Sequence, residues 1–245
     1  MPLTLISPKT MTNKLIRKNL IKRIESCLST LNSISDLDSY LKDIFKNLNK
    51  FDFNKYKQSV ETEILENLNE WWTNKDKGIK KEEELFAILF EYDYFFRKNV
   101  EATAYGIGKW KDYQVETDKF DMSFNYDFAS EFYACPGIKL NFFDSLEALD
   151  YSNLPEKYIT NNLNFDEIKI GEIIEVDEFN DIEDQFGYQE IIELHKYQGM
   201  LAIHDVLLEL DSRREFESLN YKDKFMFLIN EHDSGEFYPL LIKNK

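Results

Sequence analysis

The sequence predicts an α+β protein, in which a helical N-terminal region is followed by a mostly antiparallel sheet packed against long helices. Three observations predict this class. The first 77 residues contain no glycine and residues 9–135 contain no proline, so helix breakers are absent early in the chain. Residues 121–128 alternate between apolar and polar side chains, as a half-buried strand does. Residues 187–219 carry apolar side chains at the helical spacing of three and four.

The N-terminal region has the apolar periodicity of three consecutive helices. These helices are expected at 13–31, 35–46 and 54–72. Ser35 is the expected N-cap of the second. The segment 73–81 contains the first glycine and a cluster of lysines, which predicts a loop or a domain boundary. We therefore expect a helical region at 1–80 and an α+β domain at 81–245, with one continuous domain as the alternative.

The apolar segment 81–99 predicts a fourth helix. Glu82–Glu84 stand at its start, and Arg97 and Lys98 stand at its end, where these charges complement a helix dipole. Its apolar and aromatic side chains leave little polar surface, which favours a core helix over a ligand-binding one.

After residue 100 the periodicity becomes that of strands. Strands are expected at 102–110, 112–116 and 121–128, where Met122, Phe124, Tyr126 and Phe128 share one side. The dipeptide Pro136–Gly137 predicts a turn before a further strand, Asp144 predicts the start of a short helix, and 165–179 predicts a second extended region. The turn formers Asp233–Gly235 lie between two apolar segments, so the chain is expected to close with a β-hairpin.

The helix at 187–219 is apolar on most of its circumference, so we expect it to lie centrally against the sheet. His195 and His204 are nine positions apart on it, which at about 100° per residue places them on opposite sides. They therefore cannot bind one metal ion as an HExxH pair does. We interpret His204 as a core residue and His232 as a turn residue.

Other short motifs fail in specific ways. The doublets His204–Asp205 and His232–Asp233 match two letters of the HD phosphohydrolase pattern, but no histidine precedes His195 as those enzymes require. The acidic run 177–184 lacks the glycine of an EF-hand, since Ile182 stands at that position. Asp166, Glu167 and Lys169 form a nuclease-like triplet, with Asp150 upstream of it, but such triplets arise by chance in a chain with 31% charged residues. The sequence thus predicts no catalytic residue, no cofactor and no metal.

The cysteine pattern and the absence of targeting segments favour a cytoplasmic protein. Cys27 and Cys135 lie 108 positions apart with no metal-ligand spacing, which predicts buried free thiols. The N-terminus lacks the features of a signal peptide, and no apolar run approaches the roughly 18 residues of a membrane span. We therefore expect no contact with a membrane.

The net charge of −16 is unevenly distributed. Residues 1–81 carry 15 Lys/Arg and 10 Asp/Glu, net +5, and residues 82–245 carry 15 and 36, net −21. Six cations precede the first acid, Glu25, but they lack interleaved aromatics, which favours a solvated helix face or a strip docked on the acidic remainder of the chain. The acidic surface disfavours nucleic acid and favours a basic protein partner.

The acidic residues are densest at 164–184, where nine acids accompany one base, and the chain ends in NEHDSGEFYPLL after a long helix. A compact acidic protein of this kind without a catalytic motif resembles the small immunity proteins of bacterial toxin systems, which neutralise a toxin by covering it. The resemblance implies a non-catalytic, protein-binding function with a basic toxin as the partner. The predicted partner-binding residues are Asp177, Glu178, Asp181, Glu183 and Asp184.

Two other classes stay open. A hydrolase or nuclease would assemble its site from dispersed Asp, Glu and His residues, for example His204 and Asp127 in one cleft. A structural subunit of a larger assembly would carry an exposed apolar patch.

Overall fold

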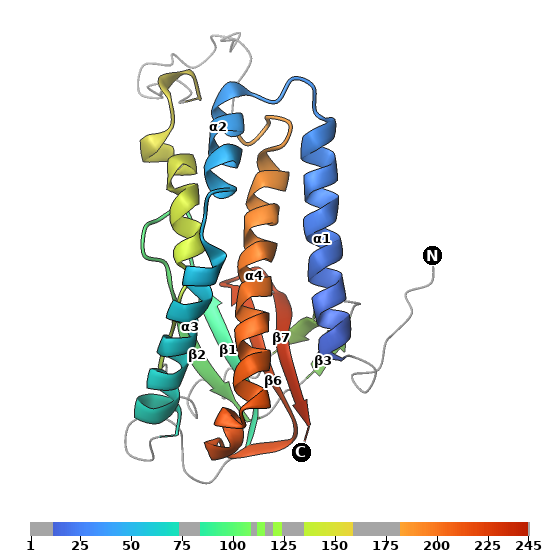
Figure 1. The fold of residues 1–245 in the computed structure, drawn as a ribbon, viewed down its shortest axis with the longest axis vertical. Helices are drawn as coiled ribbons and strands as arrows, with labels where there is room; N and C mark the ends of the chain where they lie inside the picture. The colour runs from blue at the N-terminus through green and yellow to red at the C-terminus, as the bar shows by residue number, and fades with distance from the viewer. Residues whose placement is uncertain are drawn as a thin grey trace, which may run out of the picture.

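A computed structural model describes residues 12–73, 84–108, 112–115, 120–123, 135–158 and 182–244. The fold class is the predicted one. A seven-stranded sheet has the strand order β3-β4-β7-β6-β1-β2-β5. In Figure 1 the helices α1, α3 and α4 lie side by side in front of this sheet, with α4 between the other two.

The strands are β1 (Leu85–Tyr92), β2 (Glu101–Ile107), β3 (Asp112–Val115), β4 (Phe120–Ser123), β5 (Cys135–Lys139), β6 (Tyr221–Glu231) and β7 (Glu236–Asn244). Among these strands β1 and β6 run parallel, and the other neighbouring pairs are antiparallel. The closing hairpin of β6 and β7 is confirmed, and Asp233 and Gly235 in its turn adopt positive φ angles. The strands expected at 102–110 and 112–116 are confirmed as β2 and β3. Of the strand expected at 121–128, the described residues 121–123 belong to β4.

The α-helices are α1 (Asn13–Ser33), α2 (Ser39–Leu48), α3 (Phe53–Asn67), which continues into a π-turn (Leu68–Trp72), and α4 (Tyr188–Ser212). Short 3₁₀ helices cover Asn141–Leu149, Tyr151–Asn153, Glu156–Tyr158 and Glu215–Ser218. The predicted first and third helices and the central helix are confirmed. The second begins later than expected, because Asp38 rather than Ser35 is its N-cap. The Asp38 carboxylate accepts hydrogen bonds from the backbone N–H groups of Tyr40 and Leu41.

The helix predicted at 81–99 is wrong, since residues 85–92 form β1. Ala87, Ile88, Leu89 and Phe90 are all buried, so both faces of this strand are covered. A strand buried on both faces is apolar at consecutive positions, and its sequence then reads like that of a buried helix.

The turn predicted at Pro136–Gly137 is also wrong, because both residues lie within β5 at the edge of the sheet. Proline is tolerated in an edge strand, where its missing N–H breaks no ladder. A Cβ on Gly137 would lie 2.2 Å from the backbone oxygen of Ala102, so glycine permits the close approach of β5 to β2. Asp144 does not start a helix either. Asp144 lies three residues inside the 3₁₀ helix Asn141–Leu149, and its carboxylate accepts a hydrogen bond from Asn99 N at 2.8 Å.

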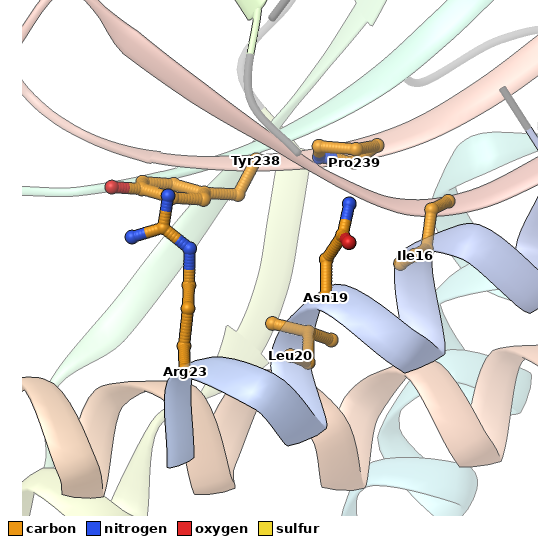
Figure 2. Close-up of a pocket in the computed structure, with 6 residues that line it drawn as sticks. All are labelled: Ile16, Asn19, Leu20, Arg23, Tyr238 and Pro239. Atoms are coloured by element: carbon orange, nitrogen blue, oxygen red, sulfur yellow. The ribbon is translucent and has the colours of Figure 1, made fainter. Parts of the chain in front are cut away.

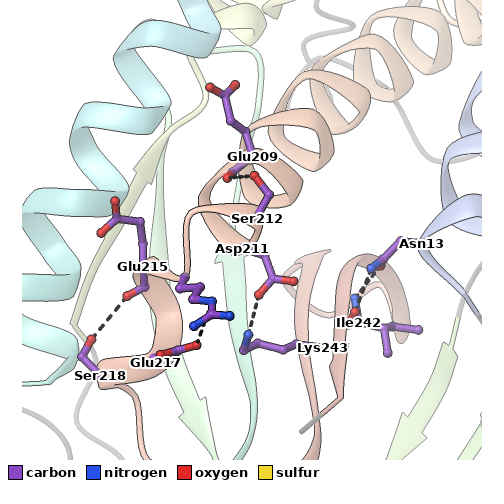
Figure 3. Close-up of polar contacts among 10 residues, drawn as sticks. Asn13, Glu209, Asp211, Ser212, Glu215, Glu217, Ser218, Ile242 and Lys243 are labelled. Atoms are coloured by element: carbon purple, nitrogen blue, oxygen red, sulfur yellow. Dashed lines mark hydrogen bonds and ion pairs between the residues drawn. The ribbon is translucent and has the colours of Figure 1, made fainter.

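Polar contacts tie the helical layer to the end of the chain, as Figure 3 shows. Asn13 makes two hydrogen bonds of 2.8 Å with the backbone of Ile242, which joins α1 to β7. Lys243 Nζ donates to Asp211 Oδ1 at 2.6 Å, which joins β7 to the last turn of α4. Phe124, Phe128 and the segments expected at 74–81 and 165–179 lie outside the described residues. The domain division at residue 80 stays a prediction.

Candidate functional site

The two histidines of α4 are core residues on separate sides of the helix. His204 Nδ1 donates to Leu240 O on β7 at 2.6 Å, and His195 Nε2 donates to Phe142 O in the 3₁₀ helix. Burial lowers the pKa of both, that of His195 to about 4, so both are neutral at neutral pH. The two rings thus lie on different sides of α4, as their nine-residue spacing predicts.

The two His-Asp doublets differ: His204 and Asp205 contact separate partners, whereas His232 Nε2 lies 3.6 Å from Asp233 Oδ2. Asp205 faces away from the His204 contact and pairs with Lys57 at 2.6 Å and with Arg17 at 3.3 Å. His232 is half exposed in the hairpin turn, where the carboxylate of Glu91 raises its pKa. Within the described part of the chain, no three His, Cys, Asp or Glu side chains gather as a metal site would require.

A cluster of polar groups lies between α1, α4 and β7 and ties these elements together. Arg23 of α1 donates to the Tyr197 hydroxyl at 2.7 Å, and its guanidinium carbon lies 5.1 Å from the centre of that ring. The Tyr238 hydroxyl donates to Glu236 at 2.8 Å. Figure 2 shows Arg23 of α1 pointing toward Tyr238 and Asn19 of α1 pointing toward Pro239 on β7. The cavity beside them has a volume of about 10 Å³, which is room for about one water molecule.

Lys196 of α4 and Glu231 of β6 form a partly enclosed ion pair next to Tyr238. Their charged atoms are 3.8 Å apart, and Lys196 also lies 5.5 Å from the centre of the Tyr238 ring. Burial lowers the pKa of Lys196 and raises that of Glu231, so each group is shifted toward its neutral form. The pair sits in side-chain packing, with side-chain exposures of 17% and 30%.

The free edge of β5 is covered by groups from α3 and its π-turn. Trp72 Nε1 donates to Pro136 O at 3.0 Å, Asn67 donates to Gly137 O, and Lys139 N donates to Glu63 at 2.7 Å. These contacts remove the unpaired backbone groups that make an edge strand prone to aggregation. Cys135 on this strand and Cys27 on α1 are buried free thiols, as predicted, and burial raises the pKa of both.

Three large apolar side chains are exposed within the described residues: Phe186 at 84%, Tyr151 at 55% and Tyr94 at 38%. They come from three separate segments. The segments around residues 151 and 186 both lie at the end of the molecule where α2 lies (Figure 1). We call the surface formed by Tyr94, Asp150, Tyr151, Glu183, Asp184 and Phe186 the aromatic–acidic patch.

Phe186 projects from a turn that is anchored on both sides. Ile182 is buried at its start, and Gln185 N donates to Ile182 O at 3.2 Å. Gly187 at its end has a φ of 92°, and a Cβ there would lie 2.6 Å from the side chain of Leu37. Glycine therefore suits both this backbone and this space, directly after the 84% exposed Phe186.

Tyr94 lies close enough to the Phe186 turn for a carboxylate of that turn to affect its pKa. The Tyr94 hydroxyl is hydrogen-bonded to the carboxylate of Asp150, which also accepts from Ser152 N at 2.9 Å. Burial raises the pKa of Tyr94, and the carboxylates of Asp150 and Glu183 raise it further. Glu183 therefore lies within electrostatic range of Tyr94.

The predicted partner-binding residues fall partly in this patch. Glu183 and Asp184 are exposed on the Phe186 turn, whereas Asp177, Glu178 and Asp181 lie outside the described residues. Sequence reasoning missed the three aromatic residues. The one local signal was a phenylalanine between Gln185 and Gly187, in a turn-forming sequence rather than an apolar run.

Comparison of this chain with protein-family models, with curated proteins and with solved structures finds no match. Among the described helices, α4 included, no stretch combines the length and the apolar character that a bilayer crossing requires.

Proposed function

We propose that this protein is a non-catalytic protein-binding protein of the cytoplasm, which captures a basic partner through the aromatic–acidic patch. The observation that carries the proposal is Phe186, 84% exposed on an anchored turn beside Glu183 and Asp184. Burying a phenylalanine side chain contributes about 1.5–3 kcal/mol, which the free protein leaves unused. Aromatic anchors within a polar rim are typical of protein interfaces.

The charge of the chain supports a basic partner over a neutral or acidic one. The net charge of −16 and the exposed carboxylates beside Phe186 would attract a basic surface and speed its association. The same field disfavours nucleic acid. A toxin neutralised by this protein, as the resemblance to immunity proteins implies, is the partner class that we propose.

A hydrolase or nuclease is the alternative function, and the described residues offer it little support. His195 and His204 are held by backbone carbonyls in the core, and the Lys196–Glu231 pair lies in packed side chains. No observation specifically favours a reaction over binding.

The test is to change Asp177, Glu178, Asp181, Glu183 and Asp184 together to Asn or Gln. We expect the fold to persist, the association of a basic partner purified from the source cell to slow, and the salt dependence of that rate to flatten. The control changes Glu66 and Asp223 to Gln and Asn, because both are exposed acids on elements at the other end of the molecule (Figure 1). A partner whose association responds to neither salt nor the five changes would contradict the proposal.

A further inference from the structure

The aromatic–acidic patch places carboxylates next to aromatic rings, and this combination selects among basic side chains. An arginine guanidinium is planar, stacks on aromatic faces and pairs with carboxylates through a fork of donors. A lysine ammonium is a more strongly hydrated point charge without a face to stack. A surface that offers both rings and carboxylates therefore gains more from arginine.

The chain already holds one arginine in this manner. The guanidinium carbon of Arg97 lies 5.2 Å from the centre of the Tyr94 ring. Its charge also lowers the pKa of Asp150, the carboxylate hydrogen-bonded to the Tyr94 hydroxyl, although the largest cause there is the hydrogen bond from Ser152. One cation thus meets both a ring and a carboxylate at this place.

The other two rings of the patch have no such neighbour. Tyr151 and Phe186 make no ring contact and no cation–π contact with any described residue, and 55% and 84% of their surfaces are exposed. Asp150 precedes Tyr151 directly, and Glu183 and Asp184 precede Phe186 by two or three residues. Each open ring therefore has a carboxylate close in the chain.

We infer that the patch recognises arginine side chains of the partner, which stack on Tyr151 and Phe186 while they pair with Asp150, Glu183 and Asp184. This inference rests on the proposed function and specifies its partner as a protein with exposed arginines. Net charge alone would make lysine and arginine equivalent, so the selectivity is a property of the rings.

The experiment uses the full chain and two labelled peptides of twelve residues, each with four arginines or four lysines in a Gly/Ser background. Dissociation constants are measured by fluorescence anisotropy at one ionic strength. We expect the arginine peptide to bind about threefold or more tightly than the lysine peptide, the size expected of exposed cation–π contacts.

The variants separate ring contacts from charge. Phe186→Leu keeps apolar volume but removes the ring, and together with Tyr151→Leu it should bring the preference for arginine close to one. Glu183→Gln with Asp184→Asn should weaken both peptides, whereas the distant pair Glu66→Gln and Asp223→Asn should weaken them less. Circular dichroism melting of each variant checks the fold.

The two proposals fail in different ways. Equal binding of both peptides, or a preference that survives both leucine substitutions, overturns the inference while the acidic binding surface stands. Suppose that Glu183→Gln with Asp184→Asn weakens the binding of both peptides no more than the distant pair Glu66→Gln with Asp223→Asn does. This result would show that the patch is not the binding site and would overturn both proposals.

Discussion

The polar cluster between α1, α4 and β7 and the aromatic–acidic patch contain the same kinds of side chain in opposite surroundings. In the cluster, Tyr197 and Tyr238 are buried, Arg23 donates to Tyr197, and Lys196 pairs with Glu231. In the patch, Tyr151 and Phe186 are exposed beside carboxylates. The polar groups of the cluster find partners within the chain, whereas no described residue covers the Tyr151 and Phe186 rings of the patch.

The polar cluster shows that a shifted pKa does not by itself mark a functional site in this protein. Burial raises the pKa of Glu231 and lowers that of Lys196, the usual mark of a functional group. Neither residue lines the cavity beside Arg23 and Tyr238, and burial is the largest cause of both shifts, so these shifts reflect packing. In this protein the exposure of Phe186 is the more informative anomaly.

The largest expected difference is in the free energy of unfolding, between alanine variants of one tyrosine from each region. Tyr238→Ala removes a ring that is 7% exposed and packs on Lys196 and Tyr197, so it should lower the free energy of unfolding by about 3–5 kcal/mol. Tyr151→Ala removes a ring that is 55% exposed and should change it by less than about 0.5 kcal/mol. Urea unfolding measures both, and similar losses would contradict the assignment of Tyr151 to an open surface.

The buried histidines should make stability depend on pH. The folded-state pKa of His195 is lowered by burial from 6.5 to about 4, so the unfolded state binds its proton first as the pH falls. The stabilisation is present above pH 6.5 and is lost between pH 6.5 and 4, up to about 3 kcal/mol for this group. In the His195→Gln variant, the free energy of unfolding should therefore change less between pH 6.5 and pH 4. Unfolding curves recorded at several pH values measure this dependence.

The exposed His232 contributes to the pH dependence of stability with the opposite sign. Its pKa is raised by Glu91, so its small contribution is present at low pH and is lost as the pH rises through its folded-state pKa. A His232→Gln variant should keep the acid sensitivity of the wild type. Loss of that sensitivity in His232→Gln would contradict the role given to His195.

A smaller effect is expected from the glycine that orients the patch. Gly187→Ala places a Cβ 2.6 Å from Leu37 at a φ of 92°, so it should lower the free energy of unfolding by about 1–3 kcal/mol and reorient Phe186. Gly235→Ala in the hairpin turn is the control, since it also has a positive φ but meets no atom within 4 Å. Calorimetric melting compares the two, and equal effects would show that Leu37 does not restrict the turn.

The smallest effect on stability belongs to the patch anchor. Phe186→Ser should change the free energy of unfolding by less than about 0.5 kcal/mol, because an exposed ring stabilises the fold little. The same substitution at Phe90, a fully buried residue of β1, should prevent stable folding. A strongly destabilised Phe186→Ser protein would mean that this ring belongs to the core.

The sequence by itself determined the elements whose evidence is local. The helices α1, α3 and α4 follow from apolar side chains at steps of three and four, and the hairpin of β6 and β7 follows from turn formers between apolar strands. The core role of His204 followed as well, because its neighbours in the helix are apolar. The Phe186 turn lies next to the predicted acidic residues, and the local signal for an exposed ring is its place between Gln185 and Gly187 in a turn-forming sequence.

Only the tertiary structure decided the features that depend on distant neighbours. Residues 85–92 form a strand rather than a helix because β2 and β6 supply hydrogen-bond partners and both faces are covered, which no local period records. Arg23 contacts Tyr197, 174 positions away, whereas the basic run alone left open a solvated face or a strip docked on the remainder of the chain. Gly187, which follows the exposed Phe186, lies against the side chain of Leu37, 150 positions earlier in the chain. Exposure is set by what folds around a side chain, so the patch could be found only in the folded chain.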